Sequence, residues 1–240
     1  MENHSVIDFN NVSISMDETH HIYENLPLYN SRFQYVMSYH DPGVAAVQNK
    51  DGAFHINLEG NSIYEKKFQK AFGFYEGYAA VSDNSGWYHI NVDGESIYKT
   101  RYEWIGNFQE ERSPVMDKLG SYFHINFDGK TVYKEKYRYV GDYKYGIAVV
   151  YLKNGFARHI DLNGNYVHDN IFEELGVFHK GFAIAKDDTG YFHINKKGYQ
   201  LYKERFKWIE PFYNENSFAC TFEGQRVVID KSGSIIHSIL

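Results

Sequence analysis

The stretch SGWYHINVDGESIYKTRYEWIGNF, residues 85–108, holds the pattern that decides the fold of this 240-residue chain. Its His89-Ile90 pair returns along the sequence at spacings of 34 or 35 residues. Self-similarity at a fixed period is the signature of a repeat architecture, in which one short unit is stacked many times. The histidine position recurs at His21, His55, His89, His124, His159 and His193, and a degenerate seventh copy has Val228 there.

Other residues recur in register with this histidine. A glycine follows the position by five residues, at Gly60, Gly94, Gly129, Gly164, Gly198 and Gly233. An aromatic residue or histidine follows it by nine, at Tyr64, Tyr98, Tyr133, His168, Tyr202 and His237. Another aromatic residue stands four positions later, at Phe68, Tyr102, Tyr137, Phe172 and Phe206, and Tyr29 and Phe33 supply the same pair in the first copy. We therefore predict a single repeat domain over residues 1–240, with units centred on the seven positions.

Each unit predicts short strands joined by tight turns. Residues 77–92, GYAAVSDNSGWYHINV, contain an apolar run, a polar turn with glycine and an alternating run, which is typical of a hairpin. Asp93-Gly94 begins a second tight turn, of the kind that needs positive φ. No segment has a sustained apolar stripe of helical period, so we expect almost no helix.

A unit of a few short strands cannot bury both of its faces, but a stack of units can. We favour a closed β-propeller of about seven short blades. The chain ends part-way through a unit, and residues Ser5 to Asn11 would supply an N-terminal strand that closes the last blade. Closure removes exposed sheet edges. The alternative is an open β-solenoid of the same repeats.

Composition limits the function. The net charge is −6, which gives no basic footprint for nucleic acid and no attraction to anionic lipid. The sequence contains no run of 18 apolar residues, the length that would predict a membrane span. The single cysteine, Cys220, and the lack of a secretory signal in residues 1–11 predict a cytoplasmic protein. Delivery to another cell by a non-classical route is compatible with the same features.

The pattern GxxHINxDGxxIYxxRYxWxGxF resembles the bacterial WG-repeat (WG-containing repeat) proteins, and the resemblance covers almost the entire chain. Residues 85–108 are the best copy. Only Trp87 directly follows its glycine; the other copies have Ala53, Ser121, Phe156, Tyr191 or Gln225 there. The resemblance implies a β-rich repeat module, often fused to other domains, without enzymatic activity.

The repeated histidines invite a catalytic or metal-binding interpretation, but six copies 34 or 35 residues apart do not make one asymmetric site. We predict instead that each imidazole forms a structural hydrogen bond with a neighbouring strand or turn. We expect no catalytic residue, no metal and no cofactor.

Two repeated positions are candidate contacts for a ligand or partner. The first is basic and the second is aromatic: Arg32, Lys67, Arg101, Lys136 and Arg205, and then Trp104, Tyr139 and Trp208. A ring of cations could hold a phosphate, a carboxylate or an acidic peptide. We favour a plainer interpretation, in which the cations pair with acidic residues near the turns, such as Glu59, Asp93 or Asp128. Exposed aromatic side chains would be the best binding candidates.

We therefore predict a monomeric, non-catalytic scaffold that binds a protein partner. The first alternative is binding of carbohydrate or a small acidic ligand at repeated aromatic pockets. The second is an enzyme with a site at the irregular repeats, around Pro114 or over Val167 to Glu174. Pro114 lacks an N–H and predicts that its strand is an edge or carries a bulge.

Overall fold

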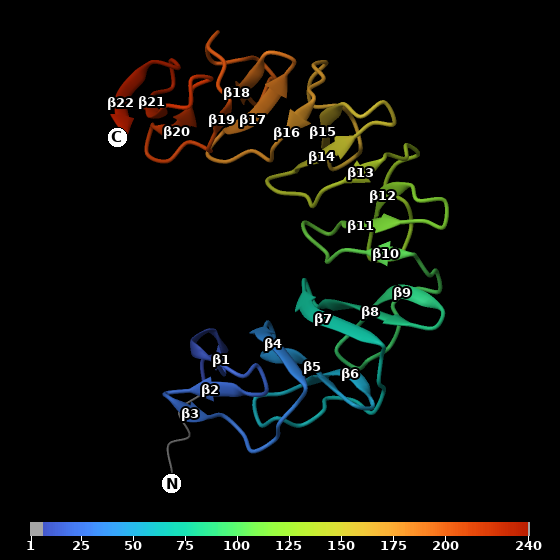
Figure 1. The fold of residues 1–240 in the computed structure, drawn as a ribbon. Helices are drawn as coiled ribbons and strands as arrows, with labels where there is room; N and C mark the ends of the chain where they lie inside the picture. Colours follow the sequence, from blue (N-terminus) through green and yellow to red (C-terminus); the bar gives the residue numbers. More distant parts are fainter. Residues whose placement is uncertain (1–6, 240) are drawn as a thin grey trace. The chain divides into compact units, whose positions relative to one another are not determined.

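A computed structural model describes residues 7–239 of the protein (Figure 1). These residues form β-strands, turns and one 3-10 helix, η1 (Phe9–Asn11), without an α-helix among them. The predicted all-β repeat fold is confirmed. None of residues 7–239 belongs to a helix long and apolar enough to cross a membrane.

The strands follow one another in seven sheets over the described residues, three consecutive strands to a sheet except in the last, which has four. The first four sheets consist of β1 (Ser13–Ile14), β2 (His21–Tyr23) and β3 (Leu26–Pro27); β4 (Tyr35–His40), β5 (Val44–Asn49) and β6 (Gly52–Ile56); β7 (Lys70–Tyr75), β8 (Tyr78–Asp83) and β9 (Gly86–Ile90); β10 (Trp104–Ile105), β11 (Ser113–Met116) and β12 (Tyr122–Ile125). The others consist of β13 (Tyr139–Val140), β14 (Ile147–Tyr151) and β15 (Ala157–Asp161); β16 (Glu174–Leu175), β17 (Phe182–Asp187) and β18 (Gly190–Asn195); β19 (Trp208–Ile209), β20 (Ser217–Cys220), β21 (Arg226–Ile229) and β22 (Ile235–Ile239).

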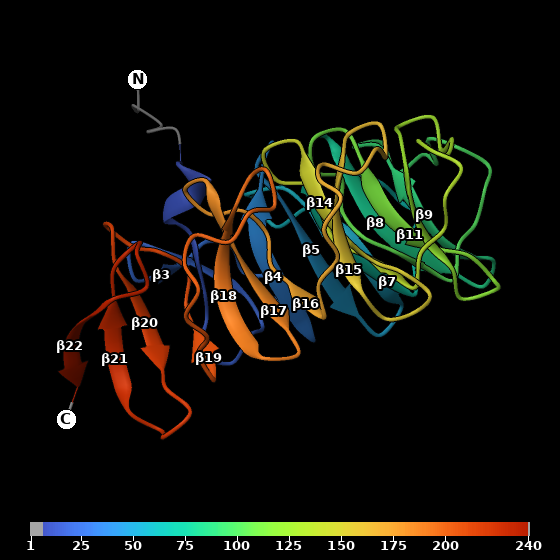
Figure 2. The same ribbon diagram turned by 90° about the horizontal axis from the view of Figure 1, so that it is seen from above.

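The chain divides into two compact units. Unit 1 comprises residues 1–120 and 125–130, and unit 2 comprises residues 121–124 and 131–240. Within unit 2, β17 and β18 lie between the β14–β15 hairpin and the last sheet (Figure 2). A sheet in the interior of a unit, such as that of β17 and β18, therefore has neighbours that can cover both of its faces.

Burial explains the composition of the hairpins. In β5 and β6, Ala45 and Ile56 are opposite one another and point to one face, while Ala46 and His55 form the adjacent pair on the other face. All four are buried, because successive sheets pack on both sides. Strands covered on both faces lose the alternation of polar and apolar residues that marks a half-exposed strand.

The recurring glycine is required because an aromatic ring of the preceding repeat leaves no room for a side chain. Gly94 has a φ of +78°, and a Cβ there would lie 2.9 Å from the Cγ of Tyr64, in the preceding repeat. L-residues disfavour this backbone region, and the contact would be a clash. The same packing joins glycine and ring in five more pairs: Gly60–Tyr29, Gly129–Tyr98, Gly164–Tyr133, Gly198–His168 and Gly233–Tyr202.

The segment expected to close a ring is only partly described. Ser5 and Val6 lie outside the described residues, and Phe9–Asn11 form η1 rather than a strand. The Asp8 side chain accepts a hydrogen bond from the Asn10 N–H (3.0 Å) at the start of this helix. Phe9 packs against the apolar core of unit 1. Ring closure therefore stays a prediction.

Candidate interaction surface

Each repeated histidine is buried and connects two successive repeats. His89 donates from Nε2 to the carbonyl oxygen of Gly106 (2.9 Å), and its Nδ1 accepts from the Tyr98 hydroxyl (2.6 Å). A carbonyl oxygen can only accept, so Nε2 carries a proton, and Nδ1 of the neutral ring is then the acceptor. The ring of Phe108 packs on the imidazole with centroids 4.2 Å apart. We call this arrangement the histidine clamp.

The clamp recurs at all six histidine positions. Nδ1 contacts the side chains of Tyr29, Tyr64, Tyr98, Tyr133, His168 and Tyr202. Nε2 contacts the carbonyl oxygens of Met37, Phe72, Gly106, Gly141, Gly176 and Glu210. The covering rings belong to Tyr39, Phe74, Phe108, Tyr143, Phe178 and Phe212. The predicted structural hydrogen bonds of the histidines are thus observed.

Burial makes these histidines poor bases. It lowers the pKa of His89 to about 3, and it lowers the pKa values of His55, His159 and His193 to about 4. Both nitrogens of each ring are already engaged, which leaves neither for a metal or a substrate proton. Among residues 7–239, no group of three or more His, Cys, Asp or Glu side chains is arranged to hold a metal ion.

The basic position is also largely occupied by internal contacts. The guanidinium of Arg101 lies over the ring of Tyr88, 3.6 Å from its centroid, and donates to the carbonyl oxygens of Tyr98, Lys99 and Thr100. Arg32 donates to the three corresponding carbonyls of its own turn. Guanidinium groups stack well on aromatic faces and donate to several acceptors at once.

The other three basic residues also lie over rings, Lys67 on Phe54, Lys136 on Phe123 and Arg205 on Phe192. Arg205 forms an ion pair with Asp187 (2.8 Å). This ion pair is of the predicted kind, because Asp187 lies at a hairpin turn, whereas Arg32 and Arg101 donate to the carbonyls of their own turns. The turn carbonyls and the aromatic face are closer partners than the carboxylates.

Two irregular repeats differ from the others, one at the basic position and one in its middle strand. Ile171 interrupts the basic series, and in that repeat Arg158 lies over Tyr166 (3.6 Å) and donates to the carbonyl of His168 (3.0 Å). Pro114 lies in β11, the middle strand of its sheet, so the predicted edge strand is wrong. Its carbonyl accepts from the Gly106 N–H (2.8 Å), a bond that proline can still form.

The aromatic position differs from the others because its side chains reach the surface. Trp104, Tyr139 and Trp208 are 38%, 47% and 47% exposed, and Tyr35 at the same position is 44% exposed. All four begin the first strand of a sheet. The equivalent Glu174 is instead engaged by the Tyr191 hydroxyl (2.8 Å) and by Lys186 (3.1 Å).

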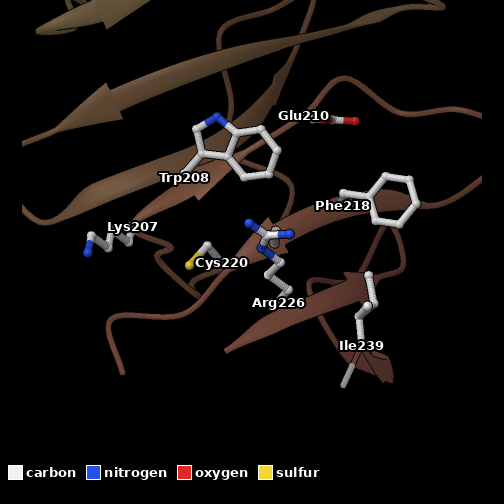
Figure 3. A pocket seen from close by; sticks show the side chains of 8 residues that line it. Lys207, Trp208, Glu210, Phe218, Cys220, Arg226 and Ile239 are labelled. Carbon is white, nitrogen blue, oxygen red and sulfur yellow. The ribbon is translucent and has the colours of Figure 1, made fainter. Parts of the chain in front are cut away.

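The last sheet presents a second exposed group. Cross-strand pairing aligns Trp208, Cys220, Arg226 and Ile239 in one row across its four strands. With Lys207, Glu210, Phe218 and Ala219 they line a hollow of about 650 Å³. Figure 3 shows the side chains of Trp208, Phe218, Arg226 and Ile239 gathered on the last sheet. We call the surface formed by Trp208, Phe218, Cys220, Arg226 and Ile239 the C-terminal face.

The C-terminal face corresponds to the clamped face of the other sheets. Val228 occupies the histidine position, and the residue opposite it is Phe218, which is 49% exposed. In the other hairpins the residue opposite the histidine is smaller: Ala46, Ala80, Val149 and Ile184. From the sequence, Val228 could be recognised as a departure from the histidine pattern, but the exposure of its sheet face could not be predicted.

Solved structures place these sheets in a known class. BamB from Moraxella catarrhalis is 11% identical with a TM-score of 0.53, and the match covers 97% of this chain and 86% of that one. The computationally designed protein Ika8 is 13% identical with a TM-score of 0.52, covering 95% and 83%. The dihydro-heme d1 dehydrogenase NirN, in complex with DHE, is 11% identical with a TM-score of 0.51, covering 98% and 65%. Such similarity shows the fold alone, a repeat protein of the β-propeller type.

Part of the chain also matches a known type of repeat. The family model described as WG containing repeat matches residues 56–87 and 90–118. These residues are therefore similar to WG repeats, as the sequence pattern predicted. A search of curated protein sequences found no match.

Proposed function

We propose that this protein is a non-catalytic scaffold that binds a partner protein through the exposed aromatic side chains of its repeats. One observation carries the proposal. The histidine position is consumed by internal hydrogen bonds, whereas Trp104, Tyr139 and Trp208 stand at the start of their strands and are 38%, 47% and 47% exposed. Large aromatic side chains held on a rigid surface are frequent anchors of protein interfaces.

The arrangement of titratable groups also favours binding over catalysis. A catalytic site needs a nucleophile or base with a free atom close to the substrate. The clamp histidines have no such atom, and Arg101 and Arg205 are bound to turn carbonyls or to Asp187. NirN is an enzyme, but its similarity to this chain concerns the fold alone.

The test compares two pairs of exposed aromatic residues. The variant Trp104→Ser/Tyr139→Ser removes one anchor from each unit and leaves the C-terminal face intact. The control Tyr145→Ser/Tyr199→Ser removes two tyrosines that are also exposed but do not belong to the repeated position. Proteins captured from a lysate are quantified by mass spectrometry for the wild type and for both variants, after matched melting temperatures are verified.

We expect at least one captured protein to fall about tenfold or more with the anchor variant and to be unchanged with the control, because aromatic hot spots contribute roughly 2 kcal/mol or more. Equal capture by both variants would refute the proposal. A glycan array is run with the same proteins. Array signals that disappear only in the anchor variant would instead support the carbohydrate alternative.

A further inference from the structure

We infer that the C-terminal face is a docking site for a segment of a partner protein that carries a carboxylate flanked by large apolar side chains. The inference rests on the proposed scaffold function and names one surface and the chemistry of its partner. Every residue that carries the argument belongs to unit 2.

The interior repeats show how a covered face is built, and the C-terminal face departs from that pattern. In the clamp the imidazole reaches the tyrosine hydroxyl of its own repeat and a backbone carbonyl of the following repeat, as His193 reaches Tyr202 and Glu210. Val228 has no nitrogen for either bond. Phe218 occupies the place of residues such as Ala46, beside which the ring of the following repeat packs. Another repeat of the same type therefore does not fit this face.

The apolar residues nevertheless form one continuous group. Trp208, Phe218 and Ile239 are 47%, 49% and 40% exposed and line the same hollow. An exposed group of large apolar side chains on a soluble protein marks a site of interaction. A partner with large apolar side chains would remove this area from water.

Charge specifies the partner further. Within residues 7–239, neither the Arg226 guanidinium nor the Lys207 ammonium takes part in a hydrogen bond or ion pair, and Glu210 is the one acidic residue that lines the hollow. Figure 3 shows the Arg226 side chain grouped with Trp208, Phe218 and Ile239 at the hollow, where a docked segment would shield its guanidinium from water. A guanidinium in such a place binds a carboxylate through two parallel hydrogen bonds. An acidic segment is therefore favoured over a basic or neutral one.

The test measures fluorescence anisotropy of three labelled dodecapeptides binding to the full chain. In each peptide leucine and phenylalanine alternate with a single polar residue type, which is Asp, Lys or Ser. We expect the Asp peptide to bind at least about tenfold more tightly than the Lys peptide. Arg226→Gln should abolish that preference, and Phe218→Ser should weaken binding of the Asp peptide. The control Lys197→Gln makes the same change of charge at an exposed residue that does not line the hollow and should leave the preference intact.

Three results would overturn the inference. The first is equal affinity for the three peptides, and the second is a preference that survives Arg226→Gln. The third is a concentration-dependent dimer in sedimentation velocity that Phe218→Ser abolishes, which would make a second copy of the chain the occupant. Because Trp104→Ser/Tyr139→Ser leaves this face intact, loss of capture by that pair without any peptide preference would sink the docking site and keep the scaffold function.

Discussion

The sheet of β16, β17 and β18 and the sheet of β19 to β22 are neighbours in unit 2. The faces that carry the histidine position nevertheless differ in exposure. On the first, His193 is opposite Ile184 and is 1% exposed, because Phe212 of the following repeat covers it. On the second, Val228 is opposite Phe218, which is 49% exposed. One pair of facing residues thus distinguishes a face that joins the next repeat from a face that remains a surface.

The two faces should also differ in how their stability depends on pH. The clamped face depends on a neutral imidazole that is out of contact with water, whereas the C-terminal face depends on no buried titratable group. Conditions that charge the imidazole should therefore affect the interior repeats and spare the last face. The predictions below separate the two faces, beginning with the largest effect.

Acidification should unfold the clamped repeats. The unfolded-state pKa of histidine is about 6.5, and the folded-state values of His55, His159 and His193 are about 4. Since the folded pKa is depressed, protons bind more tightly to the unfolded chain. The stability is complete above pH 6.5 and is lost as the pH falls toward 4, by about 1.4 kcal/mol per pH unit for each histidine. Urea unfolding followed by tryptophan fluorescence at pH 7, 6 and 5 measures the loss.

Two controls identify the source of that loss. Burial does not protect His237, which is exposed, so His237→Ala should leave the pH dependence unchanged. The carboxyl groups of Asp17 and Asp187 have pKa values of about 2, so their contribution is lost only below about pH 4. A free energy of unfolding that stays constant between pH 7 and 5 would contradict the clamp as described.

Truncation of one phenylalanine on each face should have unequal effects. Phe212 is 2% exposed and packs on His193 with ring centroids 4.0 Å apart, so Phe212→Ala should cost about 3–5 kcal/mol. Phe218 is half exposed, so Phe218→Ala should cost less than about 1 kcal/mol. Urea unfolding of both variants at pH 7 measures the difference. Similar costs for the two variants would mean that the C-terminal face is covered in solution.

Placing a histidine on the open face tests the comparison with the smallest perturbation. Val228→His restores the repeat residue on the face of the last sheet, where the large side chain of Phe218 is opposite it. We expect its imidazole to titrate near pH 6.5 in NMR spectra, as an exposed histidine does, while His193 stays near 4. A depressed value at both positions would indicate that another surface covers this sheet.

Much of the fold could be predicted from the sequence because its signal is repeated. The period of His89 and its copies indicates the number of sheets, and Asp93-Gly94 indicates a turn. The exposure of Trp104, Tyr139 and Trp208 was named as the condition for binding, and the structure meets it. No finding tests whether these side chains bind anything, so their function stays a prediction.

Some features of the structure could not be predicted from the sequence, because they involve backbone atoms or depend on which sheet lies beside them. The acceptor of the His89 Nε2 proton is a backbone carbonyl, that of Gly106, and any residue type can supply one. The covering rings, such as Phe74 and Phe108, stand 19 residues after their histidines, and a longer alignment of the repeats would have found them. β22 forms a fourth strand beside β21, whereas the corresponding Ser62 and Ser96 make only single bridges.

The clamp also restricts how the length of such a chain can change. The hydrogen bond between His89 and Gly106 joins one sheet to the sheet that follows it, and no more distant residue takes part. Inserting or deleting one whole period of 34 or 35 residues would leave every other clamp with its partners. An insertion of a few residues between His89 and Gly106 would separate the imidazole from its acceptor. Homologues of this protein should therefore differ in length by whole periods, and insertions or deletions of other lengths should lie near the two ends.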